Sequence, residues 1–166
     1  DLSEYADLSS IANWHCNDMV VSADCYAYVG NFGYDHYNEP DEVPANLVRV
    51  DPDRSIHLAD GGLRFPNGSV ITPDGKFLFG GLRGHRQDFD RVSRYRVLEN
   101  GHAEFLGLTE ADKIPWGFAL SPDGKYLLVT ATTGATLTAY RISATGDLTR
   151  AATLKWDAGM SDLVAR

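Results

Sequence analysis

Two asparagines, Asn17 and Asn67, open matching stretches of sequence that begin 50 residues apart. Amide carbonyl oxygens, together with a carboxylate, are ligands that hard divalent cations such as Ca²⁺ and Mg²⁺ prefer. Such a cation polarises an ester carbonyl and lowers the pKa of a bound water, so hydrolysis needs no nucleophilic side chain. Asn-Asp and Asn-Gly are also ordinary turn dipeptides, which leaves open a structural role in which both amides bond to turn backbone.

A second group of candidate side chains belongs mainly to two long segments that we expect to be loops, residues 31–45 and 83–91. A histidine near a carboxylate titrates close to neutral pH and can move a proton. If the loops converge, an acid–base set is formed by His15, Asp35, His36 and His85. The alternative is that these side chains are solvated loop residues without a chemical role.

The charge balance restricts the classes of partner. The chain has 15 Lys and Arg residues against 23 Asp and Glu, a formal net charge of −8, which repels phosphate backbones and anionic membrane faces. No stretch approaches the roughly 18 consecutive apolar residues of a membrane-spanning helix. We therefore expect small molecules, cations or other proteins as partners, and neither nucleic acid nor membrane. We expect a cytoplasmic location, with export left open because a chain that begins at Asp1 is compatible with processing.

A repeat organises the elements that must position these residues. Residues 67–79 read Asn-Gly-Ser-Val-Ile-Thr-Pro-Asp-Gly-Lys-Phe-Leu-Phe, and residues 116–128 read Trp-Gly-Phe-Ala-Leu-Ser-Pro-Asp-Gly-Lys-Tyr-Leu-Leu. Residues 17–29 are a third copy, and residues 161–165 begin a fourth. Each complete copy has an apolar run, a turn at Asp-Gly or its equivalent, and a second apolar run, which predicts a tight hairpin.

Further strand-like runs lie between the hairpins and are separated by turn residues. They cover residues 46–51, 55–59, 93–98, 103–108, 136–142 and 148–156. Each unit therefore contains four antiparallel strands, the pattern of a β-propeller blade of roughly 40–50 residues. We predict an all-β propeller segment that forms a single domain, with blades at approximately 17–60, 67–108 and 116–157. Partial flanking strands are expected at residues 5–8, as the tail of a preceding blade, and at residues 161–165, as the start of a following one. A β-solenoid is the weaker alternative, because its repeats are shorter.

Three blades do not close a propeller, which usually has about 4–8. We expect the chain to be part of a larger propeller, or a half-propeller that assembles as a homo-oligomer or with another chain, because open blade faces would expose apolar surface. In the closed ring, the axis would be surrounded by the first residues of the repeats, Asn17, Asn67, Trp116 and Ser161. There, Trp116 would either plug the channel or provide a stacking surface.

Several phrases resemble the SMP-30/gluconolactonase/LRE-like family. They are Asn-Asp-Met-Val-Val-Ser-Ala-Asp at 17–24, Ala-Tyr-Val-Gly-Asn-Phe-Gly-Tyr-Asp at 27–35, Asn-Leu-Val-Arg-Val-Asp at 46–51, and Leu-Arg-Phe-Pro-Asn-Gly-Ser-Val-Ile-Thr-Pro-Asp-Gly at 63–75. The likeness runs from about residue 5 to residue 81, and residues 115–130 resemble a generic lactonase-type propeller repeat. The resemblance implies a six-bladed propeller, a divalent cation in the central channel, and hydrolysis of lactones or related esters.

The resemblance also implies roles for individual residues. Asn17 and Asn67 match positions where the family places amide ligands or substrate contacts beside the metal. His15 stands where a substrate-binding Arg often occurs, and Trp116 stands where the series would have an Asp. We assign both, together with Asn17, to substrate binding. The family's Glu ligand belongs to an earlier blade that this sequence does not contain.

These observations support two hypotheses. The first is a metal-assisted hydrolase that acts on a lactone or related ester, with Ca²⁺ held by Asn17 and Asn67, Asp35 as the additional carboxylate, and Asp35 and His36 as candidate catalytic residues. The second is a non-catalytic propeller module that binds a ligand or a protein partner through its rim loops. The pair of asparagines favours the first hypothesis, and Trp116 in place of an Asp favours the second.

Overall fold

The computed structural model describes residues 3–38, 41–84, 89–160 and 163. These residues form twelve β-strands and no helix, so none of them belongs to a helix that could cross a membrane. The strands make three four-stranded antiparallel sheets, in each of which the strands follow one another in chain order. The predicted all-β, propeller-like architecture of four-stranded blades is therefore confirmed.

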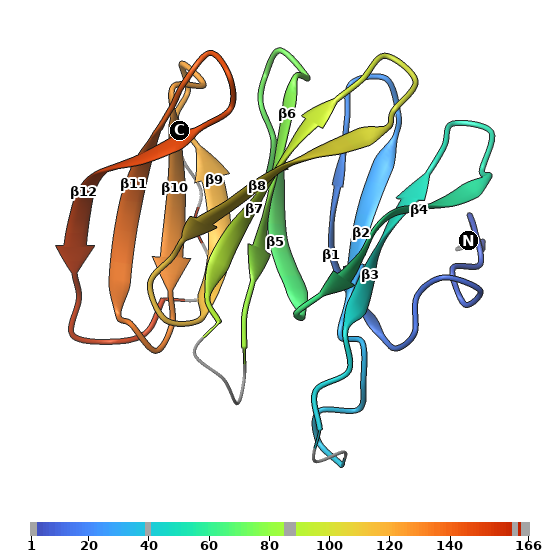
Figure 1. Cartoon of the computed structure of the whole chain (residues 1–166), viewed down its shortest axis with the longest axis horizontal. Coiled ribbons are helices and arrows are strands. Elements are labelled where there is room, and N and C mark those ends of the chain that lie inside the picture. The colour runs from blue at the N-terminus through green and yellow to red at the C-terminus, as the bar shows by residue number, and fades with distance from the viewer. Residues whose placement is uncertain (1–2, 39–40, 85–88, 161–162, 164–166) are drawn as a thin grey trace.

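The three blades stand side by side (Figure 1). Blade 1 consists of β1 (Cys16–Val21), β2 (Ala27–Asn31), β3 (Ala45–Val50) and β4 (Ile56–Leu63). Blade 2 consists of β5 (Pro66–Ile71), β6 (Phe77–Leu82), β7 (Arg91–Val97) and β8 (Ala103–Glu110). Blade 3 consists of β9 (Pro115–Leu120), β10 (Tyr126–Ala131), β11 (Thr136–Ile142) and β12 (Leu148–Lys155). The repeated phrases of the sequence are the hairpins β1–β2, β5–β6 and β9–β10.

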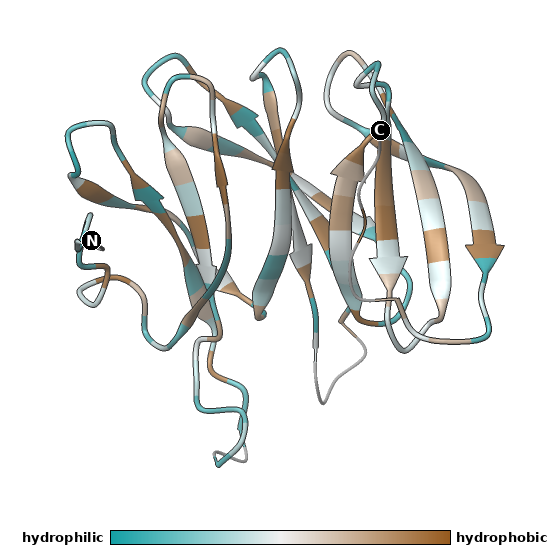
Figure 2. Ribbon diagram, turned by 180° about the vertical axis from the view of Figure 1, so that it is seen from behind, coloured by the Kyte–Doolittle hydropathy of each residue, from teal (hydrophilic) through white to brown (hydrophobic). Residues whose placement is uncertain are grey.

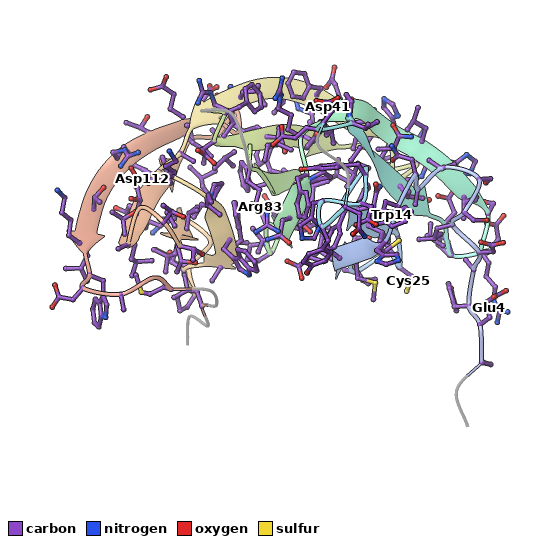
Figure 3. The ribbon with its side chains drawn as sticks, turned by 90° about the horizontal axis from the view of Figure 1, so that it is seen from below. Glu4, Trp14, Cys25, Asp41, Arg83 and Asp112 are labelled. Carbon is purple, nitrogen blue, oxygen red and sulfur yellow. The ribbon has the colours of Figure 1, made fainter. Side chains whose placement is uncertain are left out.

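Seen from below, the blades form an open arc with β1, β5 and β9 on its inner side (Figure 3). Strand β5 contacts β1 on one side and β9 on the other, as inner strands of neighbouring blades do. One edge of all three blades carries the chain just before each inner strand and just after β2, β6 and β10. It includes the described parts of the two long connections, residues 32–38, 41–44, 83–84 and 89–90. We call this edge the loop face; it lies at the bottom of Figure 1.

Alternation along the strands gives the middle blade two apolar faces. On β6, Leu78 packs into the core between blades 1 and 2 with Tyr28 and Tyr95, and Phe77 and Phe79 pack into the core between blades 2 and 3. Successive side chains of a strand point to opposite faces of the sheet, so the middle blade is covered on both sides. The hydropathy colouring of Figure 2 shows this alternation of apolar and polar residues along the strands.

The segment before blade 1 differs from the expectation of a partial flanking strand. Residues 3–15 form no strand; instead, their apolar side chains pack against Val29, Val48 and Val50 of blade 1. A strand needs a neighbour to receive its backbone hydrogen bonds, and the described residues place none beside this segment. Burial of its apolar side chains on blade 1 therefore decides its conformation.

The hairpin turns opposite the loop face need a left-handed backbone. Gly75 and Gly124 have φ values of +72° and +68°, and Cys25 adopts +65° at the equivalent position of the first repeat. Glycine takes this conformation without steric cost, whereas a side chain opposes it. The first hairpin therefore carries backbone strain that the other two avoid.

Candidate functional site

Equivalent backbone positions on the loop face present different side chains in the three blades. The residue that follows the second strand is Phe32 in blade 1, Arg83 in blade 2 and Thr132 in blade 3. Their N–H groups donate, at 2.9, 3.1 and 2.9 Å, to the carbonyl oxygens of His15, Arg64 and Ile114. The backbone geometry at this position is thus the same in the three blades, and the side chain differs from blade to blade.

The most unusual of these groups is the guanidinium of Arg83. The residue is 4% exposed, and its guanidinium carbon lies 4.2 Å from the ring centre of Phe65 and 4.0 Å from that of Trp116. Burial lowers the pKa of Arg83 to about 10, and the charge of Asp18 opposes this shift, so the side chain stays protonated at neutral pH.

Two donors of this buried cation, Nε and Nη1 of Arg83, have no hydrogen-bond partner in the described part of the chain. Buried polar groups are normally paired, and a charged donor that lacks a partner is costly. A carbonyl oxygen or an anion is the chemical group that a guanidinium in this state would bind best. The surroundings of Arg83 therefore favour an electron-rich oxygen.

Phe65 reaches Arg83 through a strained backbone. Its φ is +42°, directly before Pro66, and the equivalent residue of blade 3, Ile114, has a φ of +60°. Bulky residues rarely adopt positive φ values, and such a backbone conformation persists where the surrounding structure enforces it. The Phe65 ring stacks on Phe32 with the ring centres 4.5 Å apart and the planes 18° apart, which joins blade 1 to the Arg83 stack.

His36 belongs to the same aromatic cluster. Its ring meets Phe32 and Phe65 edge-on, with centre distances of 5.0 and 5.5 Å. Burial and the charge of Arg83 lower the pKa of His36, and Asp35 opposes them. The imidazole is therefore neutral at neutral pH. The ring centre of His15 lies 6.3 Å from that of Phe32, and the His15 ring stacks on Trp14 with the ring centres 4.8 Å apart.

Asp35 closes a local turn. Its Oδ1 accepts the N–H of Tyr37 at 3.1 Å, and its Oδ2 accepts Nδ2 of Asn38 at 2.7 Å. The bond from Asn38 is the main cause of the lowered pKa of Asp35. The carboxylate is therefore ionised at neutral pH, and its hydrogen bonds to Tyr37 and Asn38 stabilise this turn.

The two asparagines lie on neighbouring inner strands, β1 and β5. Nδ2 of Asn17 donates to the carbonyl oxygen of Pro66 at 2.7 Å, and Oδ1 of Asn17 accepts the N–H of Asp18 at 2.8 Å, so this amide links blades 1 and 2. Asn67 is 7% exposed, and its Nδ2 has no partner among the described residues. Of the two amide nitrogens, Nδ2 of Asn67 is thus the one without a hydrogen bond to the described residues.

A groove of about 490 Å³ runs along the inner strands and is lined by Asp18, Ser69 and Trp116 among others. Trp116 thus forms a wall of the groove, and Arg83 lies over its ring. Figure 3 shows Arg83 on the inner side of the arc, between the blades. A small molecule in the groove would contact the Trp116 ring close to the buried guanidinium.

The described residues do not fit the divalent cation that the resemblance implied. No three His, Cys, Asp or Glu side chains gather within the described ranges. Asp18 is the carboxylate beside the asparagines. It accepts a hydrogen bond from the N–H of Gly68 at 2.8 Å, and its charge interacts with that of Arg83. Neutral amides compensate little of a divalent charge, and a nearby guanidinium opposes it further. The donor set suits an oxygen-bearing ligand better than a cation.

Several of the residues singled out from the sequence converge and others do not. His15, His36 and Trp116 meet one continuous cluster of aromatic rings and arginine, whereas His85 and Ser161 lie outside the described residues. Sequence reasoning missed Arg83 and its aromatic neighbours Phe32 and Phe65. The available signal was positional, because Phe32 and Arg83 both directly follow the second strand of a repeat.

Comparison with known families decides the relationship. A family model described as "Lactonase, 7-bladed beta-propeller" matches residues 67–160, which is more than half of the chain. The chain belongs to this lactonase family. A second model, the SMP-30/Gluconolactonase/LRE-like region, matches residues 1–81 of the lactonase-family chain. Both resemblances expected from the sequence are thus found, and the lactonase match extends well before residue 115.

Solved structures share the fold of this lactonase-family chain. A 6-phosphogluconolactonase candidate from Bacteroides fragilis NCTC 9343 superposes with a TM-score of 0.71 at 21% identity, covering 89% of this chain and 41% of its own. The periplasmic gluconolactonase PpgL of Pseudomonas aeruginosa gives 0.68 at 17%, with 90% and 42% covered. The gluconolactonase XC5397 of Xanthomonas campestris gives 0.61 at 16%, with 89% and 49% covered.

At sequence identities of 16%, 17% and 21%, the similarity to these three structures shows a shared fold. The lactonase-family chain spans less than half the length of each of these three proteins. No curated protein matches it.

Proposed function

We propose that this chain supplies the carbonyl-binding side of a hydrolytic site that opens lactones or related esters. The observation that supports this most is the buried, protonated Arg83 with two unpartnered donors beside the groove. Water adds to the lactone carbonyl carbon, the ring C–O bond breaks, and the hydroxy acid formed releases a proton at neutral pH. Negative charge develops on the carbonyl oxygen during addition, and a fixed guanidinium in a water-poor site stabilises it.

His36 is our candidate for the general base. It is neutral at neutral pH and contacts Phe65, the ring on which Arg83 also lies. A neutral imidazole can accept the proton of the attacking water. We prefer His36 to Asp35, because the Asp35 carboxylate is engaged in its own turn.

The groove suggests how a lactone would be held. Trp116 offers an aromatic wall of the groove. Asn67 lines an adjoining cavity that shares Asp18, Gly68 and Ser69 with the groove, and its Nδ2 is a buried donor for a ligand oxygen that reaches this cavity. The related structures named as gluconolactonases make gluconolactone the first substrate to test. Metal assistance forms no part of this proposal, because the described donor set does not fit a divalent cation. We also propose that further blades, from a longer polypeptide or from a second copy, complete the ring.

The test is gluconolactone hydrolysis followed by proton release in a pH-stat. Arg83→Met removes the charge and keeps the volume, and we expect it to lower kcat/KM by roughly a hundredfold. The matched control is Arg96→Met, because Arg96 is a half-exposed arginine of the same blade that pairs with Glu104 at 3.6 Å. Equal activity of the two variants would contradict the proposal.

Binding without turnover is the second candidate function. It is favoured by the contacts of Arg83 with the Phe65 and Trp116 rings, an arrangement that suits an oxygen-bearing ligand but supplies no paired carboxylates. Calorimetry with gluconate separates the two functions. Gluconate binding that depends on Arg83, without proton release from the lactone, would assign the chain to ligand binding.

A further inference from the structure

Arg64 connects two rim segments that approach the proposed site from different blades. Nη1 of Arg64 lies 3.2 Å from Oε2 of Glu42, in the segment that leads into β3. The guanidinium carbon of Arg64 lies 5.1 Å from the ring centre of Phe89, in the segment that leads into β7. A single side chain therefore contacts the ends of both long connections of the loop face.

The backbone of Arg64 is joined to the site as well. Its carbonyl oxygen accepts the N–H of Arg83 at 3.1 Å. The next residue, Phe65, has the left-handed φ of +42° and places its ring against the Arg83 guanidinium. A strained conformation persists only where neighbouring contacts enforce it. Ile114 adopts the same conformation in blade 3, so the backbone turn belongs to the repeat, and the contacts of the Arg64 side chain bear on where this turn holds the Phe65 ring.

Both partners of Arg64 are anchored. The Glu42 side chain is 11% exposed, so its ion pair with Arg64 is shielded from water more than a typical surface pair is. Phe89 packs against the core between blades 1 and 2, and the Arg91 guanidinium carbon lies 5.4 Å from its ring centre. Movement of either segment would pull Arg64 away from the other.

We propose that Arg64 is a positioning residue that couples residues 41–44 to residues 89–90 and thereby holds Phe65 against Arg83. A planar guanidinium can pair with a carboxylate through its edge and stack on a ring through its face. Lysine can do the first but stacks poorly. The coupling itself does not depend on the proposed hydrolysis; only its consequence for substrate binding rests on that function.

Hydrogen exchange measured by mass spectrometry tests the coupling without any activity. In Arg64→Ala, peptides covering residues 41–47 and 89–94 should both exchange about fivefold faster, the effect of losing roughly 1 kcal/mol. In Arg64→Lys, residues 41–47 should stay within about twofold of the wild type while residues 89–94 exchange faster. The control Arg96→Ala, which breaks an ion pair on the outer part of the same blade, should change neither peptide.

Glu42→Gln is the complementary variant, because it removes one charge and leaves Arg64 and Phe89 intact. Faster exchange of residues 89–94 in Glu42→Gln would support the coupling, and this result would stand even if Arg64→Ala did not fold. A change confined to residues 41–47 would overturn it, as would an Arg64→Ala variant that affects only one segment. Absence of lactone hydrolysis in the wild type, with exchange coupled as described, would refute the proposed function and leave the coupling intact.

Discussion

The guanidinium carbon of Arg83 lies 4.0 Å from the ring centre of Trp116, which belongs to the inner strand of the next blade. The resemblance had placed an Asp at position 116. A carboxylate there would neutralise Arg83 or bind a metal, whereas an aromatic face attracts the cation and leaves its charge available. The Trp116 ring and the Arg83 cation therefore make one unit that suits an oxygen-bearing ligand.

Trp116→Asp and Trp116→Leu distinguish a role of position 116 in ligand binding from a role in metal binding. We expect both to weaken gluconate binding, the aspartate more strongly, because its charge pairs with Arg83 and repels the ligand. Calorimetry checks this, with Trp156→Leu as the control, since Trp156 is 55% exposed and follows β12. Calcium binding gained by Trp116→Asp, with gluconate affinity retained, would instead support the metal hypothesis.

Acidification should act on His36. Its pKa is lower in the folded protein than the usual 6.5, so the unfolded chain takes up the proton first as the pH falls. The stability contributed by neutral His36 is thus complete above pH 6.5 and is lost as the pH falls through that value toward the folded pKa. Arg83→Met should raise the pKa of His36, and Arg96→Met should not. An NMR titration of the imidazole that shows the same pKa in both variants would contradict the arrangement.

Cys25→Gly should stabilise the protein. Cys25 holds a φ of +65° at a position where the other hairpins have glycine, and relief of that conformation is worth about 1 kcal/mol. Gly75→Ala is the converse control, because a Cβ there meets no atom within 4 Å and only the backbone effect remains. Thermal unfolding should show opposite shifts of Tm for the two substitutions; a lower Tm for Cys25→Gly would contradict the explanation.

Asn17→Ala should cost stability and leave the response to calcium unchanged. It removes the donor to the Pro66 carbonyl and the acceptor of the Asp18 N–H, which costs about 1–3 kcal/mol. The control is Asn100→Ala, since Asn100 accepts a local turn hydrogen bond from the N–H of His102 in an exposed position. If calcium raised the Tm of the wild type but not of Asn17→Ala, Asn17 would be a metal ligand after all.

The strands could be predicted because their signals are local. Residues 136–142 were expected as a strand from apolar alternation between turns, and β11 covers Thr136–Ile142. Repetition strengthened each assignment, since three copies of one phrase must fold alike. The segment at residues 5–8 was expected to be a strand and is not one, because strand formation there depends on a neighbour that sequence patterns do not reveal.

The site could be predicted only in part. His36 and Trp116 were singled out by residue type and position in the repeat. Arg83 was not, because its role arises from Phe65 and Trp116, which come from different blades and meet it only after packing. No local pattern distinguishes an arginine at a solvated loop start from one that is buried between two rings.

Titration of the full chain with gluconate in a calorimeter, with and without calcium, tests most directly whether Arg83 is the centre of the binding site. We expect wild-type protein to bind gluconate equally well in both conditions, and Arg83→Met to lose at least about tenfold in affinity, the effect of one charged hydrogen-bond donor. Arg83→Met that binds as tightly as the wild type, or wild-type binding that requires calcium, would contradict the account.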